Sequence, residues 1–128
     1  MSCIGSNLQS ILYIEDDAAL ARLLQKRMER AGFNVDIAAS AEEGFSMLQE
    51  QAYDLVLLDY RMPGKNGVQV YQDIRAAGSD VPVILVTAMN GVAAIAAENG
   101  IALFLEKPFG IDELLAIIKR TGLAGRAS

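Results

Sequence analysis

The 128-residue chain lacks histidine and tryptophan altogether and has a single cysteine, Cys3. The absence of histidine excludes Ser-His-Asp and Cys-His catalytic groups and imidazole metal ligands. It also excludes the phospho-donor half of a His-Asp relay. One cysteine cannot close an internal disulfide, which indicates a reducing compartment and predicts a cytoplasmic protein. Any chemistry must therefore come from carboxylates, hydroxyls, lysines and arginines.

Positive charge and long apolar runs are also scarce. The 11 basic and 16 acidic side chains give a formal net charge of −5, which argues against direct nucleic-acid binding because that needs a basic patch. The apolar runs, such as 55–58 and 83–86, are too short for a membrane span, and the first ten residues do not resemble a signal peptide. Hydrophobic residues make up 52% of the chain, as expected for one globular domain.

Short apolar runs typical of strands alternate with helical patterns along the chain. Strands are expected at 10–14, 33–39, 53–59, 81–86 and 101–105. A helical pattern follows each strand, at 20–31, 41–52, 68–77, 92–99 and 111–120. Five such units predict an α/β fold with a parallel sheet and helices on both faces. We expect one domain at 10–121, between an N-terminal tail at 1–9 and a C-terminal tail or truncated linker at 122–128.

Local signals indicate how the helices begin and which sides they bury. Ser40 and Glu43 form the pattern of a capping box, and Gly32 is placed to end the preceding helix. The expected inward-facing residues of the first two helices are Leu20, Leu23, Leu24, Met28 and Ala31, then Phe45, Leu48 and Ala52. The last helix has an apolar stripe of Ile111, Leu114, Leu115 and Ile118. Ile117 lies off that stripe; a single exposed apolar residue is the ordinary explanation, and a partner or dimer face is the alternative.

Polar side chains follow four of the predicted strands at the point where each strand ends. They are Glu15, Asp16 and Asp17 after the first, Asp59 after the third, Thr87 after the fourth and Lys107 after the fifth. Taken singly, each has a plain explanation: Asp17 suits the first turn of a helix, Thr87 a strand end and Lys107 the surface. In an open α/β sheet, however, ligands bind at the carboxyl ends of the strands. The occurrence of all these polar side chains at one edge of the sheet therefore favours a functional site.

Clustered carboxylates repel one another and need a cation. An oxygen-only ligand set selects a hard ion, with Mg²⁺ first and Mn²⁺ as an alternative. Mg²⁺ takes one or two carboxylates and completes its shell with water and phosphate oxygens. A nearby lysine and hydroxyl would meet the remaining phosphate oxygens. The cluster thus indicates phosphoryl transfer with an aspartate as the nucleophile.

Four motifs together resemble the receiver domain of two-component response regulators, including regulators of the chemotaxis type. They are ILYIEDD (11–17), LVLLDYRMPGKNG (55–67), VILVTA (83–88) and FLEKPF (104–109), and the likeness runs from about residue 10 to residue 120. The resemblance implies a flavodoxin-like (βα)5 fold with a five-stranded parallel sheet in the order 2-1-3-4-5. It also implies a signalling switch that phosphorylates and dephosphorylates itself rather than a turnover enzyme.

The resemblance implies a role for each matched residue. Asp59 corresponds to the phosphoacceptor, Asp16 to a direct Mg²⁺ ligand and Glu15 to an acid acting through water, which leaves Asp17 a bystander. The backbone carbonyl of Arg61 corresponds to the third protein ligand. The remaining roles are a switch hydroxyl at Thr87, a switch aromatic at Phe104, a phosphate-pairing lysine at Lys107 and a cis bond between Lys107 and Pro108.

The implied partner is a histidine kinase or a histidine phosphotransfer protein that donates a phosphoryl group to Asp59. The surface formed by the fourth helix, fifth strand and fifth helix would then change, and the same surface is a candidate homodimer face. Two fewer residues than expected separate Thr87 from Lys107, which predicts a short or mobile fourth helix. Arg61 and Met89, each two residues after a site residue, offer no group to orient water and predict slow autodephosphorylation.

Two other functions stay open. The first is a receiver-fold interaction module that takes no phosphate. The second is a Mg²⁺-dependent phosphatase of the haloacid-dehalogenase style, which would need an aspartate where Arg61 stands. Dinucleotide binding is excluded because no glycine-rich loop follows the first strand.

Overall fold

The computed structural model of the chain describes residues 9–88 and 92–123. Its five strands form one parallel sheet in the order β2-β1-β3-β4-β5, as the sequence predicts. The strands are β1 (Ser10–Ile14), β2 (Asn34–Ala38), β3 (Leu55–Asp59), β4 (Val83–Thr87) and β5 (Leu103–Glu106). The helices are α1 (Ala18–Arg30), α2 (Ala41–Glu50), α3 (Gly67–Ala76), α4 (Val92–Glu98) and α5 (Ile111–Lys119).

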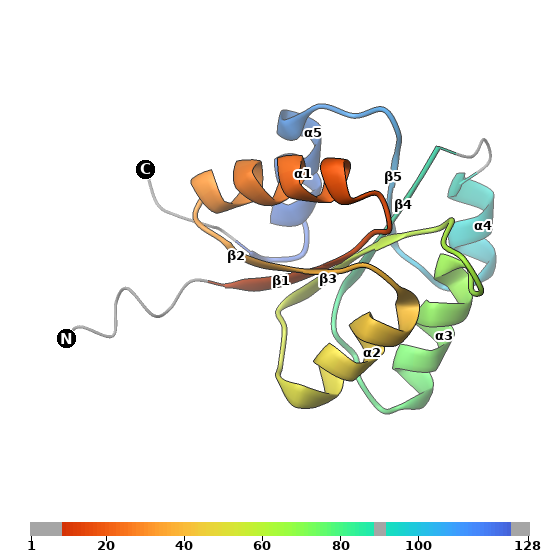
Figure 1. The fold of residues 1–128 in the computed structure, drawn as a ribbon. Helices are drawn as coiled ribbons and strands as arrows, with labels where there is room; N and C mark the ends of the chain where they lie inside the picture. The colour runs from red at the N-terminus through yellow and green to blue at the C-terminus, as the bar shows by residue number, and fades with distance from the viewer. Residues whose placement is uncertain (1–8, 89–91, 124–128) are drawn as a thin grey trace.

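The helices cover both faces of the sheet (Figure 1). One face packs against α1 and α5 and the other against α2 and α3, with α4 near the β5 edge. Successive residues of a strand point to opposite faces, so β1 sends Ile11 and Tyr13 to the α1/α5 side and Leu12 and Ile14 to the other. Both sides are apolar, which explains why the central strands read as continuous hydrophobic runs. Within the described ranges, no helix is long and apolar enough to cross a membrane.

Side-chain caps fix where the first two helices begin. The Asp17 carboxylate accepts a hydrogen bond from the Leu20 amide at 3.1 Å, and the Ser40 hydroxyl accepts one from the Glu43 amide at 3.1 Å. These bonds satisfy amides that have no partner within the helix. The Glu43 carboxylate binds the amide of Ala39 at 2.9 Å, one residue before the cap. Ser40 is therefore the predicted N-cap, although the reciprocal bond lies one residue earlier than in a capping box.

Several predictions of buried helix faces are wrong. Leu23 is 48% exposed, because α1 buries the narrower stripe of Ala21, Leu24 and Met28. Ala52 is exposed because α2 ends at Glu50. In α5 the buried residues are Leu114, Ile117 and Ile118, so Ile117 is core rather than a partner face. The true stripe follows i, i+3, i+4 spacing from Leu114, which sequence alone could not rank above the stripe from Ile111.

The fourth helix is short, as predicted, with seven residues. Two hydrogen bonds hold its carboxyl end. The Asn99 side chain donates to the Ile95 carbonyl at 2.8 Å, and the backbone amide of Ile101 donates to the Ala96 carbonyl at 2.8 Å. Two side chains of α3 reach the same end of α4, since Tyr71 donates to the Gly100 carbonyl and Gln72 to Asn99. Met89, on which the dephosphorylation prediction partly depends, lies outside the described residues, as does Cys3.

Candidate functional site

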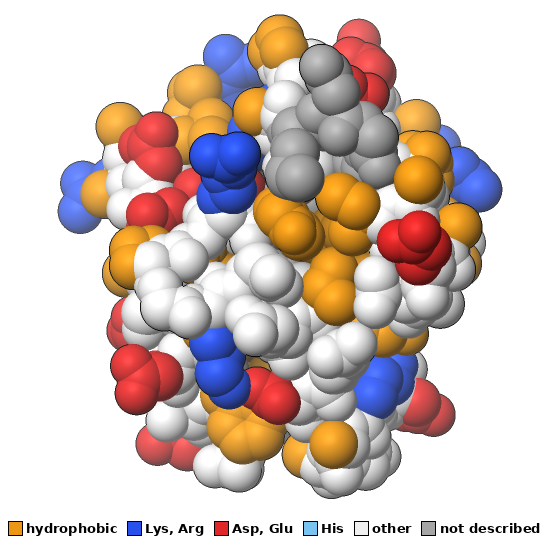
Figure 2. Space-filling view, turned by 90° about the vertical axis from the view of Figure 1, so that its right-hand side faces the viewer, with side chains coloured by type: hydrophobic (Ala, Val, Ile, Leu, Met, Phe, Trp, Pro, Cys, Tyr) orange, Lys and Arg blue, Asp and Glu red, His pale blue; other side chains and the backbone are white. Residues whose placement is uncertain are grey.

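Strand alternation gathers the charged side chains of the carboxyl edge on one face. Glu15, Asp59 and Lys107 each come two residues after a side chain that packs under α1 and α5. Those three preceding residues are Tyr13, Leu57 and Leu105. Because the period of a strand is two, the charged groups emerge from three strands on the same side of the sheet. Figure 2 shows the surface of the molecule at the carboxyl ends of the strands. Acidic, basic and hydrophobic side chains lie close together on it.

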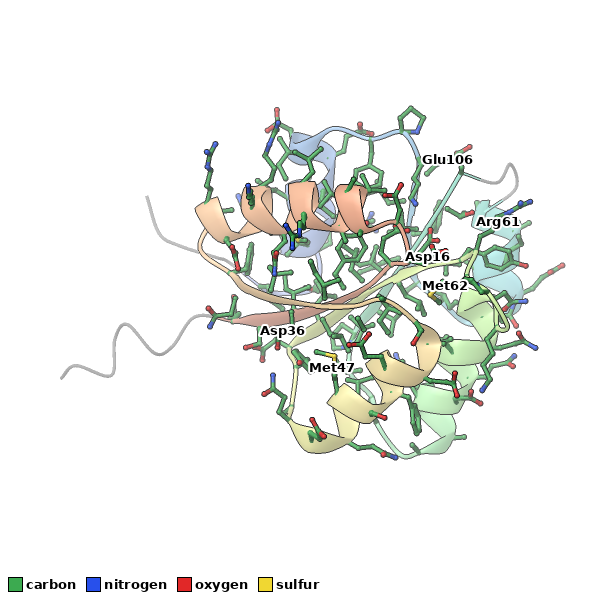
Figure 3. The ribbon with its side chains drawn as sticks, viewed as in Figure 1. Asp16, Asp36, Met47, Arg61, Met62 and Glu106 are labelled. Carbon is green, nitrogen blue, oxygen red and sulfur yellow. The ribbon has the colours of Figure 1, made fainter. Side chains whose placement is uncertain are left out.

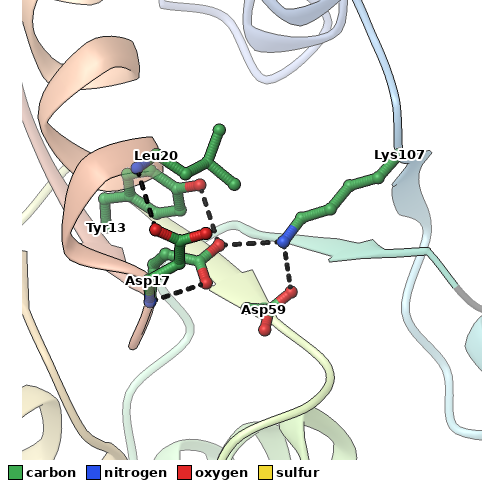
Figure 4. A network of polar contacts seen from close by, with 6 residues as sticks. Tyr13, Asp17, Leu20, Asp59 and Lys107 are labelled. Atoms are coloured by element: carbon green, nitrogen blue, oxygen red, sulfur yellow. Dashed lines mark hydrogen bonds and ion pairs between the residues drawn. The ribbon is translucent and has the colours of Figure 1, made fainter.

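Lys107 stands between the two buried carboxylates (Figure 4). Its Nζ lies 3.0 Å from Glu15 Oε1 and 3.0 Å from Asp59 Oδ1. Glu15 is 2% exposed and Asp59 is 4% exposed, so this lysine offsets charge that water reaches poorly. The Lys107 amide also donates to the Thr87 carbonyl at 2.8 Å, which joins the ends of β4 and β5. The ammonium group is thereby held at the centre of the edge.

The Glu15 carboxylate has two further donors. The Tyr13 hydroxyl donates to Oε1 at 3.1 Å, and the Asp17 amide donates to Oε2 at 3.2 Å (Figure 4). Asp17 itself caps α1 through Leu20, as expected for a residue outside the acidic cluster. Sequence reasoning missed Tyr13, which looks like an ordinary core aromatic. The available signal was its i, i+2 spacing from Glu15, which places both side chains on one face.

Three carboxylates converge closely enough to hold a cation. Glu15, Asp16 and Asp59 each offer an oxygen, and these oxygens all lie within 4.8 Å of one another. One lysine cannot balance three carboxylates, and the donor atoms are all oxygen, so the residues fit a hard divalent ion such as Mg²⁺. Asp16 also lines a hollow of about 410 Å³ that includes Arg61 and Met62. Asp16 follows β1 and Arg61 follows β3, and the two lie on the same side of the molecule, away from Asp36 (Figure 3).

Burial sets the protonation of the central pair. Removal from water raises the pKa of Asp59 from its ordinary 3.8 to about 6, and the charge of Glu15 adds to the rise, while the hydrogen bond from Lys107 opposes it. Burial lowers the pKa of Lys107, but hydrogen bonds to Glu15 and Asp59 more than offset that effect and leave its pKa above the ordinary value. Lys107 is therefore a permanent cation, and Asp59 gains from any further positive charge nearby.

Thr87 and Phe104 belong to the opposite side of the sheet. Thr87 is 1% exposed and comes two residues after Leu85, which packs in the core under α2 and α3. Phe104 pairs in register with Leu85 and is 37% exposed. The side chains of Leu103 and Leu105 turn toward α1 and α5, so Phe104 points away from them, on the face of Thr87. The peptide bond between Lys107 and Pro108 is cis, the geometry that the resemblance implies.

Comparisons with known proteins agree with this architecture. The family model for the response regulator receiver domain matches residues 11–119. Among curated proteins, the uncharacterized transcriptional regulatory protein YkoG of Bacillus subtilis is 39% identical over 85% of this chain and 49% of its own length. The swarming motility regulation protein RssB of Serratia marcescens is 34% identical over 93% of this chain and 56% of its own length. The chain spans about half the length of the curated relatives it matches.

Solved structures share the fold over nearly the whole chain. The response regulator TrrA of Thermotoga maritima, solved in complex with Mg²⁺-BeF, has a TM-score of 0.82 and 30% identity, covering 89% of this chain and 99% of that one. The non-phosphorylated HemR receiver domain of Leptospira biflexa has a TM-score of 0.81 and 32% identity, covering 94% of this chain and 98% of that one. The chain therefore belongs to the response regulator receiver domain family of two-component systems.

Proposed function

We propose that this receiver domain accepts a phosphoryl group on Asp59 from the phosphohistidine of a partner kinase or phosphotransfer protein. The observation that carries the proposal is the position of Lys107, 3.0 Å from both Glu15 and Asp59, beside three converging carboxylates. Because the chain has no histidine, the donor imidazole must lie outside these 128 residues. TrrA, a relative that resembles this chain over most of its length, binds Mg²⁺ and BeF in its crystal.

The chemistry follows from what these side chains can do. A carboxylate oxygen of Asp59 forms a bond to phosphorus while the bond between phosphorus and the imidazole nitrogen breaks, and the histidine leaves. Lys107 donates hydrogen bonds to the transferring group and stabilises its charge. Glu15, Asp16, Asp59 and the Arg61 carbonyl are the proposed groups that hold Mg²⁺, or Mn²⁺, with Glu15 acting through water. When bound, the ion supplies positive charge that neutralises the phosphoryl oxygens.

Phosphorylation is proposed to shift the population of two surface states. Thr87 bonds the phosphoryl group, and Phe104, now 37% exposed, turns inward on the same face of the sheet. The phosphate must bond one state more strongly than the other for this shift to occur. The surface of α4, β5 and α5 then presents a changed face to a downstream partner or a second copy of the chain. This acidic domain is proposed to act in the cytoplasm without binding nucleic acid itself.

Two further proposals concern the limits of the domain and the lifetime of the phosphate. The receiver domain is placed at 10–121 with tails on both sides, although Leu123 is 6% exposed and packs with the α1/α5 core.

Slow autodephosphorylation is proposed because Arg61 and Met89 provide no carboxylate or amide to orient the attacking water. A phosphate lifetime of seconds on Asp59 would contradict it.

The test of phosphorylation uses acetyl phosphate as the phosphodonor. With Mg²⁺ present, wild-type protein should gain one phosphoryl group, measured as a mass increase, and Asp59→Asn should gain none because the nucleophile is lost. Asp54→Asn is the matched control, since Asp54 is an exposed aspartate that accepts a hydrogen bond from the Ser10 amide. No label on the wild type from acetyl phosphate or a cognate kinase would instead favour the interaction module that takes no phosphate.

A phosphatase of the haloacid-dehalogenase style is the weaker alternative. That chemistry needs a second aspartate two residues after the nucleophile, and Arg61 stands at that position. Hydrolysis of a phosphomonoester by the purified chain over many turnovers would support the phosphatase alternative.

A further inference from the structure

Tyr13 is a buried, polar side chain for which the proposed phosphotransfer has no role. It lies in the middle of β1, its side chain is 0% exposed, and it packs with the core under α1 and α5. Its hydroxyl points along the strand toward the site and donates to Glu15 Oε1 at 3.1 Å. An apolar phenylalanine of the same shape would fill the same space, so the hydroxyl is the feature that needs an explanation.

The hydroxyl completes the set of donors around Glu15. Oε1 accepts from Tyr13 and from Lys107, and Oε2 accepts from the Asp17 amide. The three donors come from the body of β1, from the residue that follows β5 and from the turn before α1. A carboxylate held on both oxygens from three directions has one favoured orientation. Removing any donor frees it to rotate and leaves a buried charge short of a partner.

Tyr13 acts as a donor and not as an acid. Its hydroxyl donates its hydrogen to Glu15 Oε1, because a carboxylate oxygen can only accept. The rest of the Glu15 environment is charged: Lys107 on one side and Asp59 and Asp16 beyond it. The phenol therefore supplies a fixed, neutral hydrogen bond in a place where a second cation would compete with a metal ion.

We propose that Tyr13 is a positioning residue for the metal site. Its hydroxyl holds the Glu15 carboxylate in the orientation in which it meets Lys107 and converges with Asp16 and Asp59. The inference rests on the proposed function, because it takes Mg²⁺ as the ion that these carboxylates hold. Partners of this kind, which orient a ligand without touching the metal, commonly change metal affinity by about 10- to 100-fold when they are lost.

The experiment measures Mg²⁺ binding by calorimetry on the folded 128-residue chain. Tyr13→Phe removes only the hydroxyl and should raise the Kd for Mg²⁺ by about tenfold, since Glu15 is no longer oriented. Tyr53→Phe is the matched control: Tyr53 also donates its hydroxyl to a carboxylate, Asp36 Oδ2 at 2.7 Å, but away from the site. That control should leave the Kd for Mg²⁺ within about twofold of wild type, because it does not touch the cluster.

A second measurement separates positioning from general stability. In acetyl phosphate labelling, Tyr13→Phe should need about tenfold more Mg²⁺ for half-maximal rate, with the rate at saturating Mg²⁺ close to wild type. A merely structural role would lower thermal stability in both tyrosine variants and leave the Mg²⁺ dependence unchanged. An unchanged Kd for Mg²⁺ in folded Tyr13→Phe would overturn the inference.

A double-mutant cycle tests whether Tyr13 acts on the metal site through Glu15. In a Glu15→Gln background, the further change Tyr13→Phe should not alter Mg²⁺ affinity, because its target is already gone. An equal loss in both backgrounds would contradict positioning through Glu15. Failure of the proposed function is recognised separately: wild-type protein would bind no Mg²⁺, or Asp16→Asn would bind it as well as wild type does.

Discussion

The two ends of the sheet use the same kinds of side chain in opposite ways. Near the amino end of β3, the Tyr53 hydroxyl and the Gln51 side chain donate to Asp36, in the middle of β2, at 2.7 Å and 3.1 Å. Asp54 accepts from the Ser10 amide at 2.7 Å. These carboxylates are exposed and each has neutral donors. At the carboxyl ends, Glu15 and Asp59 are buried and share one ammonium group.

The difference shows which carboxylates are poised to react. An exposed carboxylate is already stabilised by water and by its neutral donors. A cation or a phosphoryl group therefore adds little further stabilisation. Buried carboxylates that share one cation have a higher free energy, because each has lost its water without gaining a counter-ion of its own. The raised pKa of Asp59, about 6, reflects this cost. Three substitutions can break or sharpen the comparison, and they follow from the largest expected effect to the smallest.

Lys107→Met should give the largest loss of stability. It leaves Glu15 and Asp59 buried without their shared cation, and we expect the free energy of unfolding at pH 7.5 without Mg²⁺ to fall by about 3 kcal/mol. Urea unfolding followed by circular dichroism measures it. The matched control is Lys65→Met, which breaks an exposed ion pair with Asp73 and should cost less than about 0.5 kcal/mol. Equal losses in the free energy of unfolding would show that Lys107 stabilises the buried cluster no more than Lys65 stabilises its surface ion pair.

Asp59→Asn should stabilise the protein, with a defined pH dependence. Folded Asp59 keeps its proton up to about pH 6, whereas the unfolded chain loses it near 3.8, so wild-type stability falls as pH rises through that window. Asparagine stays neutral and avoids this loss. We expect a gain that approaches about 3 kcal/mol above pH 6.5 and shrinks toward zero below pH 4, because each pKa unit corresponds to about 1.4 kcal/mol.

The measurement is urea unfolding of both proteins between pH 4 and pH 8 without Mg²⁺. A gain that is constant over this range would contradict the assignment to Asp59, because an uncharged packing effect does not titrate. Addition of Mg²⁺ should reduce the gain, since the ion stabilises the wild-type carboxylate by binding to the folded state.

Asp36→Asn applies the same chemical change at the other end of the sheet and should do least. The amide oxygen of asparagine still accepts from the Tyr53 hydroxyl, and the site is exposed, so the free energy of unfolding should change by less than about 0.5 kcal/mol. A gain as large as that of Asp59→Asn would remove the contrast between the two ends.

Much of the site could be predicted from sequence because it follows from strand ends. Four apolar runs, followed by Glu15, Asp59, Thr87 and Lys107, specify which residues reach the carboxyl edge of a parallel sheet. The same reasoning failed for the outer faces of helices. Leu23 and Ile117 are both apolar and both lie near an apolar stripe, yet one is 48% exposed and the other 7%. Only the angle at which each helix packs decides between them.

The sequence by itself determined the α/β class, the strand order expected from the family resemblance and the set of polar residues at one edge. Tertiary structure decided how those residues pair. That Lys107 serves both Glu15 and Asp59, and that Tyr13 orients Glu15, depends on strand register and on which face each side chain takes. The physical reason is that hydrophobic periodicity is local, whereas a hydrogen bond between residues 92 positions apart exists only once the sheet has formed.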